Sequence, residues 1–223
     1  MAIDAVVALK TLAQSKRRLS AVLSDEQRCD LVEAMARDVL SCLMAHPEID
    51  TVHAVCGEGW VRSDFPEGAL VMWEEGENRE GGLIAAYEMV AAKTAAERLL
   101  FIHADLPFLG REDISAVIAA SSDHHTVLSP DLTETGTNAV LRWRHQSLPL
   151  CFGEDSFARH QQAAKATGAP WRVVRAQGVA RDVDQPEDLD RLGRNDPDLG
   201  EATARWSALT DINVSMSATH RAC

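Results

Sequence analysis

The residues best suited to chemistry in this 223-residue sequence are three aspartates that follow predicted strands. Asp105 comes after the apolar run 99–103 and just before Pro107, which ends a strand because it has no backbone N–H to donate. Asp182 and Asp184 form an Asp-Val-Asp pattern, which puts both side chains on one face of an extended segment. Open α/β sheets bind ligands at the carboxyl ends of their strands. Carboxylates that converge there suit Mg²⁺, which takes one or two such oxygens and leaves room for phosphates.

A basic segment follows the first predicted strand, residues 5–9, and contains Lys10, Lys16, Arg17 and Arg18. Loops in this position hold phosphates through backbone N–H groups and cations. The segment contains neither G-x-G-x-x-G nor G-x-x-x-x-G-K-[ST], so a dinucleotide-binding fingerprint and a P-loop are both excluded. The alternative is an ordinary solvated loop. For Asp182 and Asp184 the alternative is helix capping ahead of Pro186.

A third group combines two glycine-containing turns, residues 133–138 and 151–157. They supply Thr137, Gly153 and Ser156, a set of hydroxyls and backbone that suits an anion or a carboxylate. The second turn also begins a predicted helix, whose N-terminus favours negative charge. The alternative is two ordinary turns with Asp155 or Ser156 as a helix cap. Of the eight histidines, which form no metal-binding pattern, His145 and His160 lie near this group in the sequence.

The elements that position these groups alternate between strands and helices, which predicts an α/β fold with a mostly parallel sheet covered on both faces. Ser24 and Gln27 form a capping-box signature ahead of a long helix. We expect one domain over residues 1–194 and a weakly ordered tail over 195–223, from which Ala204, Trp206, Leu209 and Ile212 could dock. Strands are predicted at 5–9, 51–56, 69–73, 99–103, 125–128, 139–143 and 171–174. Helices are predicted from the cap at Ser24 up to Pro47, at 83–96, from 110 to about 120 and at 156–167, and the segment 182–189 leads into a further short helix.

Composition narrows the range of partners. The chain has 22 Lys and Arg against 34 Asp and Glu, a net charge of −12, which argues against nucleic acid and anionic membranes as partners. No apolar stretch approaches the roughly 20 residues of a membrane helix, and the N-terminus lacks a signal-peptide pattern, so a cytoplasmic protein is expected. The five cysteines show no C-x-x-C spacing, so neither a zinc site nor a disulfide framework is indicated.

Five motifs in this order resemble the CofC/FbiD family, the guanylyltransferases of coenzyme F-420 biosynthesis. They are LK-x-L-x-x-x-K-x-R-L from Leu9, ADLPFL from Ala104, SPD-x-x-x-x-GTNA from Ser129, FG-x-x-SFARH from Phe152 and DVD-x-PEDL from Asp182. The resemblance runs from about residue 6 to residue 192, and its most specific part is the GTNA and SFARH pair.

The resemblance implies a single Rossmann-like nucleotidyltransferase domain of the nucleotide-diphospho-sugar transferase type. It also implies transfer of GMP from GTP to 2-phospho-L-lactate, phosphoenolpyruvate or 3-phospho-D-glycerate, with Mg²⁺ as cofactor and pyrophosphate as product. By resemblance, the catalytic residues are Lys16, Asp105 and Asp182, and the metal ligands are Asp105 and Asp182 with Asp184 as a neighbour. The resemblance also implies that the nucleotide is bound by Lys10, Lys16 and Arg17. The acceptor is expected to contact Thr137, Gly153 and Ser156. The oligomeric state stays open, a homodimer included.

Two departures from the family pattern stand out. Ile84 replaces an asparagine that tends to face the nucleotide, and the tail after Arg194 differs from the family. Two alternatives therefore accompany the guanylyltransferase hypothesis. One is a molybdopterin-type nucleotidyltransferase, although those relatives carry a glycine-rich first loop that this chain lacks. The other is a catalytically silent nucleotide-binding module that regulates a partner.

Overall fold

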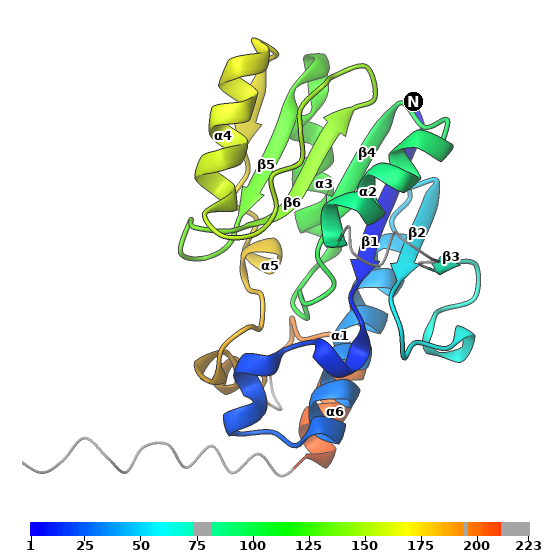
Figure 1. Ribbon diagram of the computed structural model, residues 1–223, viewed down its shortest axis with the longest axis vertical. Coiled ribbons are helices and arrows are strands. Elements are labelled where there is room, and N and C mark those ends of the chain that lie inside the picture. The colour runs from blue at the N-terminus through cyan, green and yellow to red at the C-terminus, as the bar shows by residue number, and fades with distance from the viewer. Residues whose placement is uncertain (74–81, 194–195, 211–223) are drawn as a thin grey trace, which may run out of the picture.

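The fold is organised around a seven-stranded sheet, seen in a computed structural model that describes residues 1–73, 82–193 and 196–210 (Figure 1). The strand order is β3-β2-β1-β4-β6-β5-β7. Strand β6 runs antiparallel to β4 and β5, and the other pairs are parallel, so the predicted mostly parallel sheet is confirmed. The strands are β1 (Ile3–Leu9), β2 (Thr51–Cys56), β3 (Leu70–Trp73), β4 (Arg98–Ile102), β5 (Thr126–Pro130), β6 (Thr137–Trp143) and β7 (Trp171–Val173).

Helices cover both faces of the sheet, as the sequence predicts. Along β1, Ala5 and Val7 belong to one hydrophobic cluster, whereas Val6 belongs to the other, because alternate side chains of a strand point to opposite faces. The helices of the first face are α1 (Asp25–Met44), α3 (Arg111–Ala120), α5 (Gln177–Ala180) and α6 (Glu201–Leu209), and those of the second are α2 (Gly82–Lys93) and α4 (Ser156–Thr167). Short 3-10 turns are η1 (Leu12–Gln14), η2 (Arg17–Ala21), η3 (Arg62–Asp64), η5 (Ser122–His124) and η6 (Pro186–Arg191).

Helix α1 begins where the sequence predicts. The Ser24 side chain accepts a hydrogen bond from the Gln27 N–H at 3.2 Å, and the Gln27 side chain accepts from the Ser24 N–H at 2.9 Å. This capping box satisfies backbone donors that the first helical turn leaves unpaired. It also fixes the point where the basic segment after β1 ends and the helix takes over.

The expectation of a weakly ordered tail is wrong for residues 201–209, and of the residues expected to dock from it Ala204 and Trp206 do pack on the core whereas Leu209 is exposed. Residues 201–209 form helix α6, which packs alongside α1 and buries Thr203 and Trp206 (Figure 1). Asp38 of α1 accepts hydrogen bonds from the N–H groups of Ala202 and Thr203 at 2.9 and 2.8 Å, and from the Thr203 hydroxyl at 2.6 Å. The first turn of α6 is therefore capped by a side chain more than 160 residues away, which no local pattern reveals. Residues 211–223, including Ile212, lie outside the described part.

Replacing Asp38 with alanine is expected to lower the free energy of unfolding by about 2 kcal/mol, because two N–H groups lose a charged acceptor. Urea denaturation followed by circular dichroism measures the change. Asp30→Ala provides the control, since Asp30 is an exposed residue of the same helix. Equal stability of the two variants would show that Asp38 does not anchor α6.

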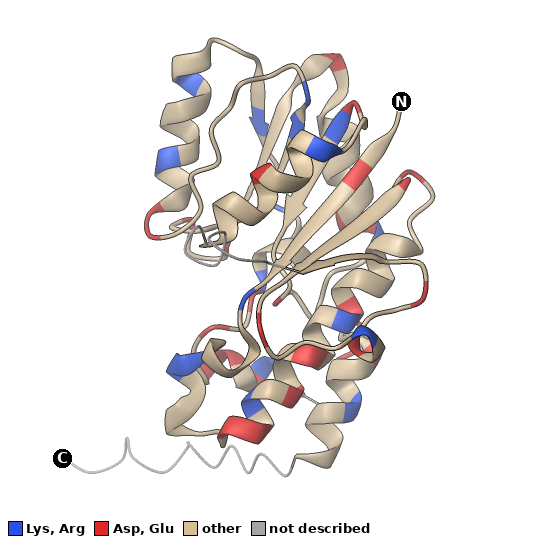
Figure 2. Cartoon of the chain, turned by 45° about the vertical axis from the view of Figure 1, so that its right-hand side comes forward, with Lys and Arg blue, Asp and Glu red and all other residues tan. Residues whose placement is uncertain are grey.

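Charged residues lie mainly on the helices and connections, while the strands are largely free of them (Figure 2). Both signs of charge meet in the lower part of the view, where η2, η6 and the start of α1 lie. Within the described ranges, no helix has the combination of length and apolar character that crossing a bilayer requires.

Candidate active site

The predicted catalytic residues come together at the carboxyl edge of the parallel strands. Lys16 lies between η1 and η2 after β1, Asp105 follows β4, and Asp182 and Asp184 lie between α5 and η6. Turns η2 and η6 pack against each other, although they are far apart in the sequence (Figure 1). This packing brings the basic segment to the Asp-Val-Asp segment, as the carboxyl-edge argument predicts.

Lys16 is the centre of the cluster. Its ammonium donates hydrogen bonds to Asp105 Oδ2 and Asp184 Oδ1, and only 9% of its side chain is exposed. Its backbone is left-handed, with a φ of 51°, which is uncommon for a residue with a Cβ and marks a constrained position. Burial alone would lower the pKa of Lys16, but the two carboxylates outweigh it and raise that pKa above its usual value. The group is therefore a permanent cation at neutral pH.

Asp105 is a charged carboxylate, and only one of its two oxygens accepts a hydrogen bond from another described side chain. Burial would raise its pKa, but the Lys16 ammonium beside it holds that pKa below the usual value. Its Oδ2 accepts from Lys16, whereas its Oδ1 is buried and has no hydrogen-bond partner among the described residues. The Asp105 carbonyl accepts from the Val183 N–H at 3.2 Å, which ties the strand end to the Asp-Val-Asp segment.

Asp182 differs from Asp105 in its electrostatics. Burial, followed by the nearby negative charge of Asp105, raises the pKa of Asp182 to about 7, against the lowering effect of a hydrogen bond from Asn138. Asn138 Nδ2 donates to Asp182 Oδ1 at 3.2 Å and to the Val179 carbonyl at 2.9 Å. The carboxylates of Asp182 and Asp105 thus repel each other across the site, which is the arrangement that a bound cation relieves.

The capping alternative for the Asp-Val-Asp segment is wrong. Gln185, not Asp184, is the N-cap residue of η6, and the Asp184 side chain instead binds Lys16. The side chain that serves the start of η6 is that of Asp188, which accepts from the N–H groups of Asp184 and Gln185 at 2.9 and 2.7 Å. These two bonds leave the Asp184 carboxylate directed at the cluster.

The donor set fits a magnesium ion that shares its ligands with a substrate. In the part of the chain that the structure describes, no three His, Cys, Asp or Glu side chains form a ready-made metal site. Mg²⁺ usually takes only one or two protein carboxylates and completes its coordination with phosphates and water. The unpartnered, buried Oδ1 of Asp105 and the raised pKa of Asp182 both fit such a cation.

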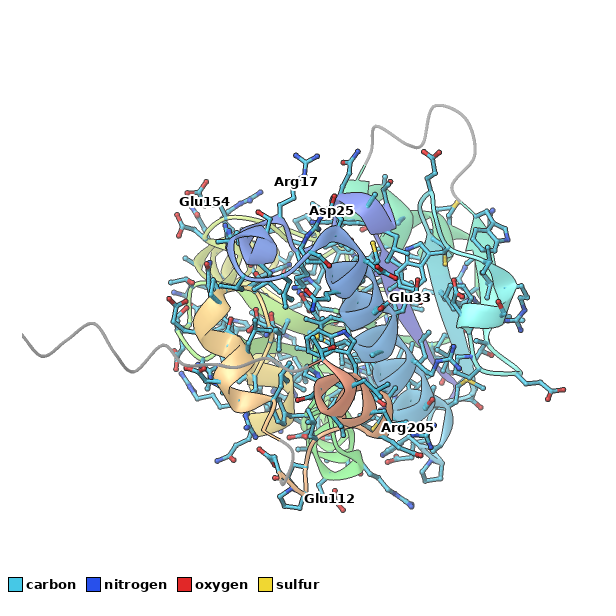
Figure 3. All side chains as sticks on the ribbon, turned by 90° about the horizontal axis from the view of Figure 1, so that it is seen from below. Arg17, Asp25, Glu33, Glu112, Glu154 and Arg205 are labelled. Atoms are coloured by element: carbon cyan, nitrogen blue, oxygen red, sulfur yellow. The ribbon has the colours of Figure 1, made fainter. Side chains whose placement is uncertain are left out.

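Of the three cations predicted to bind the nucleotide, the structure places only Lys16 in the cluster. Lys16 lies in the cluster, but Lys10 and Arg17 have exposed side chains, and Arg17 projects outward in the view from below (Figure 3). Arg18, which belongs to the basic segment but received no nucleotide-binding role from the family resemblance, approaches the cluster with its Nη1 3.9 Å from Asp184 Oδ2. Sequence spacing could not separate Arg17 from Arg18, because the conformation of the turn η2 decides which of the two reaches Asp184.

The residues predicted to bind the acceptor lie together at the start of β6 and α4. The Thr137 N–H donates to Ser156 Oγ at 2.8 Å, and both residues are almost fully buried. Gly153 has a φ of 116°, a conformation that residues with a Cβ rarely adopt. The capping alternative holds only in part, because Asp155 occupies the N-cap position of α4 but its side chain makes no cap bond, and Ser156 bonds Thr137 instead.

Of the two histidines that lie near this group in the sequence, only His160 lies near it in the structure. His160 is fully buried, and its Nδ1 lies 3.0 Å from Thr137 Oγ1. His145 lies elsewhere, with its ring against His124 and Trp143. His103 adds an imidazole between the two parts of the site, with its ring 5.1 Å from that of Phe152 and a buried Nε2 that has no hydrogen-bond partner among the described residues.

Sequence reasoning missed Asn138 as a site residue and gave His160 no defined role. Both stand inside the quoted motifs, GTNA and SFARH, so the motifs were the available signal. Adjacent residues of a strand point to opposite faces, and for this reason Thr137 turns toward α4 while Asn138 turns toward Asp182.

Comparison with known proteins agrees with this geometry. The family model described as "Guanylyl transferase CofC like" matches residues 3–215. This chain belongs to that family. The family match reaches into the segment after Arg194, so the view that this segment departs from the family is wrong at least as far as residue 215. The CofC-like chain is therefore an enzyme of the nucleotidyltransferase class.

Individual relatives support the same assignment. The phosphoenolpyruvate guanylyltransferase of Sphaerobacter thermophilus is 34% identical over 194 residues, covering 86% of this chain and 93% of that protein. The 3-phospho-D-glycerate guanylyltransferase of Phenylobacterium zucineum is 31% identical over 223 residues, covering 92% and 99%. The solved structure of CMP:2-keto-3-deoxy-manno-octonic acid synthetase shares the fold, with a TM-score of 0.58 at 12% identity over 86% of this chain and 97% of that one.

The sequence departure at Ile84 falls inside helix α2. The Ile84 side chain is partly buried and packs against the hydrophobic cluster on the α2 and α4 face of the sheet. Residues 74–81, which precede this helix, lie outside the described residues.

Proposed function

We propose that this protein transfers GMP from GTP to the phosphate of a three-carbon acid, with release of pyrophosphate, in a cytoplasmic route to coenzyme F-420. The candidate acceptors are 2-phospho-L-lactate, phosphoenolpyruvate and 3-phospho-D-glycerate. The observation that carries the proposal is the convergence of Lys16 with Asp105, Asp182 and Asp184 at the carboxyl edge of the sheet, beside Thr137 and Ser156. The cluster around Lys16 suits a triphosphate, and the pair Thr137 and Ser156 suits a small anion.

In the proposed reaction, an oxygen of the acceptor phosphate attacks the α-phosphorus of GTP. A new P–O bond forms, the bond between the α-phosphorus and the pyrophosphate oxygen breaks, and pyrophosphate leaves with the electron pair. The acceptor oxygen is already anionic, so no side chain has to remove a proton from it. The protein supplies positioning and charge neutralisation, which is what phosphoryl chemistry of this kind requires.

Each residue of the cluster has a role in this scheme. Lys16 neutralises phosphate charge, because its pKa lies above the usual value and its ammonium stays protonated. Asp105 and Asp182, with Asp184 beside them, would hold Mg²⁺, which supplies charge neutralisation and alignment of the phosphates when bound. Lys16 bridges Asp105 and Asp184 in the structure, so its ammonium must share these carboxylates with a bound cation or move toward the phosphates.

A direct assay tests the proposal. The purified protein is incubated with GTP, Mg²⁺ and each of the three acids in turn, and pyrophosphate release is measured together with the guanylylated product. Release with one acid is expected to exceed release with the other two, because polar contacts reject close analogues strongly. Absence of release with all three acids would contradict the proposal and favour a silent nucleotide-binding module or a molybdopterin-type nucleotidyltransferase.

A further inference from the structure

His160 is a buried titratable residue to which the proposed reaction gives no role. It is 0% exposed and sits in α4, the helix that begins at the acceptor-binding turn. Its ring packs against Phe152 with the centroids 5.0 Å apart. Both of its ring nitrogens have partners, the Cys151 N–H and the Thr137 hydroxyl. A histidine that served only to fill space would not need two oriented polar contacts.

The backbone fixes the tautomer of this histidine. The Cys151 N–H donates to His160 Nε2 at 2.8 Å, so Nε2 carries a lone pair and no hydrogen. Burial lowers the pKa of His160 to about 4, against the raising effect of a backbone hydrogen bond to Ser156, so the ring is neutral at physiological pH. The single ring hydrogen is therefore on Nδ1, which faces Thr137 Oγ1 at 3.0 Å.

This tautomer determines the direction of the Thr137 hydroxyl. Because Nδ1–H donates to Thr137 Oγ1, the hydroxyl accepts there and its own hydrogen points elsewhere. The same applies to Ser156, whose Oγ accepts from the Thr137 N–H at 2.8 Å. Among the described residues, neither hydroxyl has an acceptor for its hydrogen. A buried donor without an acceptor is costly, so a ligand oxygen is the natural partner.

We propose that His160 is a positioning residue, which holds the Thr137 hydroxyl as a hydrogen-bond donor toward an anionic oxygen of the acceptor acid. The inference rests on the proposed function, since it deepens the account of acceptor binding at that site. It makes the pair of hydroxyls a two-donor site, which suits a carboxylate or phosphate oxygen and rejects a ligand group that can only donate.

Two substitutions separate positioning from packing. In His160→Asn, the amide nitrogen takes the place of Nδ1 and keeps the donor to Thr137. In His160→Gln, the longer side chain serves the Cys151 N–H in place of Nε2 and leaves Thr137 without its donor. We expect His160→Gln to raise KM for the acceptor about 10-fold, the cost of one misdirected hydrogen bond, with kcat and KM for GTP unchanged. His160→Asn is expected to stay within about 3-fold of the original protein.

A double-mutant cycle tests whether the effect of His160→Gln on the acceptor KM depends on the Thr137 hydroxyl. In a Thr137→Val background there is no hydroxyl to orient, so adding His160→Gln is expected to change the acceptor KM no further. Additive effects would overturn the proposal, and so would equal KM values for the Asn and Gln variants of the otherwise unchanged protein. A rise in KM for GTP alongside that for the acceptor would indicate general damage to the fold and would also overturn it.

A spectroscopic measurement keeps the inference testable apart from activity. In the unsubstituted protein, ¹⁵N NMR of the imidazole nitrogens is expected to show His160 protonated on Nδ1 and unprotonated on Nε2. The opposite tautomer, or a charged ring at pH 7, would overturn the proposal even if the enzyme is active. Failure of all three acids in the pyrophosphate assay would instead overturn the proposed function and leave this tautomer measurement unaffected.

Discussion

Replacing Asp105 with asparagine is expected to lower kcat/KM for GTP by about 10³-fold, the largest loss of activity among single substitutions in this chain. Asparagine keeps the shape of the side chain but removes its charge and replaces one of the two carboxylate oxygens with an NH2 group, which cannot bind a cation where Oδ1, unpartnered among the described residues, now lies. Lys16 retains Asp184 as an acceptor, so the variant is expected to fold. Pyrophosphate release measures the rate, and isothermal titration with Mg²⁺ and GTP measures whether metal-dependent binding weakens.

Asp123→Asn is the matched control for this prediction. Asp123 is exposed and has a left-handed backbone, which asparagine also tolerates, and it lies beyond the end of α3, in η5. This control should keep full activity and an unchanged unfolding midpoint. Retained activity in Asp105→Asn would remove Asp105 from the metal-binding set, and the cluster would then have to be read as a structural ion pair.

The fold was predictable because most of its elements are locally encoded. The capping box at Ser24 predicts the first residue of α1, and the apolar run before Asp105 predicts both ends of β4 to within a residue. Helix α6 was not predictable in the same way, because the group that satisfies its first turn is Asp38, far away in the sequence. The residues after Arg194 are mostly polar or small, and nothing in them indicates that Asp38 caps this helix.

In the candidate site too, the position of residues in the fold was more predictable than their contacts. Asp105 follows the end of β4 and Lys16 lies in the segment after β1, so topology alone brings these two residues together. Asp182 comes after helix α5, and the hydrogen bond from the Val183 N–H to the Asp105 carbonyl holds its segment at the site. The orientation of individual side chains was not predictable. Arg18 rather than Arg17 approaches Asp184, and His160 reaches Thr137 across 23 positions of sequence. Such choices depend on the turn geometry of η2 and on how α4 packs over β6, which residue types and spacing do not determine.

Lys16→Met tests whether the central cation serves catalysis, stability or both. Methionine fills similar space but leaves the Asp105 and Asp184 carboxylates facing each other without a cation. We expect the rate to fall about 10²- to 10³-fold and the free energy of unfolding to fall by about 3 kcal/mol, since removing one partner leaves a largely buried charge uncompensated. Lys93→Met, at an exposed position of α2, is the control for the loss of an ammonium.

The double variant Lys16→Met with Asp105→Asn separates the two roles. Removing both charges takes away the unpaired carboxylate, so stability is expected to recover most of the 3 kcal/mol or so lost in Lys16→Met, while activity stays as low as in either single variant. If Lys16 were only a structural counter-ion, the single variant would lose stability but keep its rate when assayed in folded form. A double variant that is less stable than Lys16→Met alone would contradict the electrostatic account, because it would mean that Asp105 stabilises the fold without its lysine.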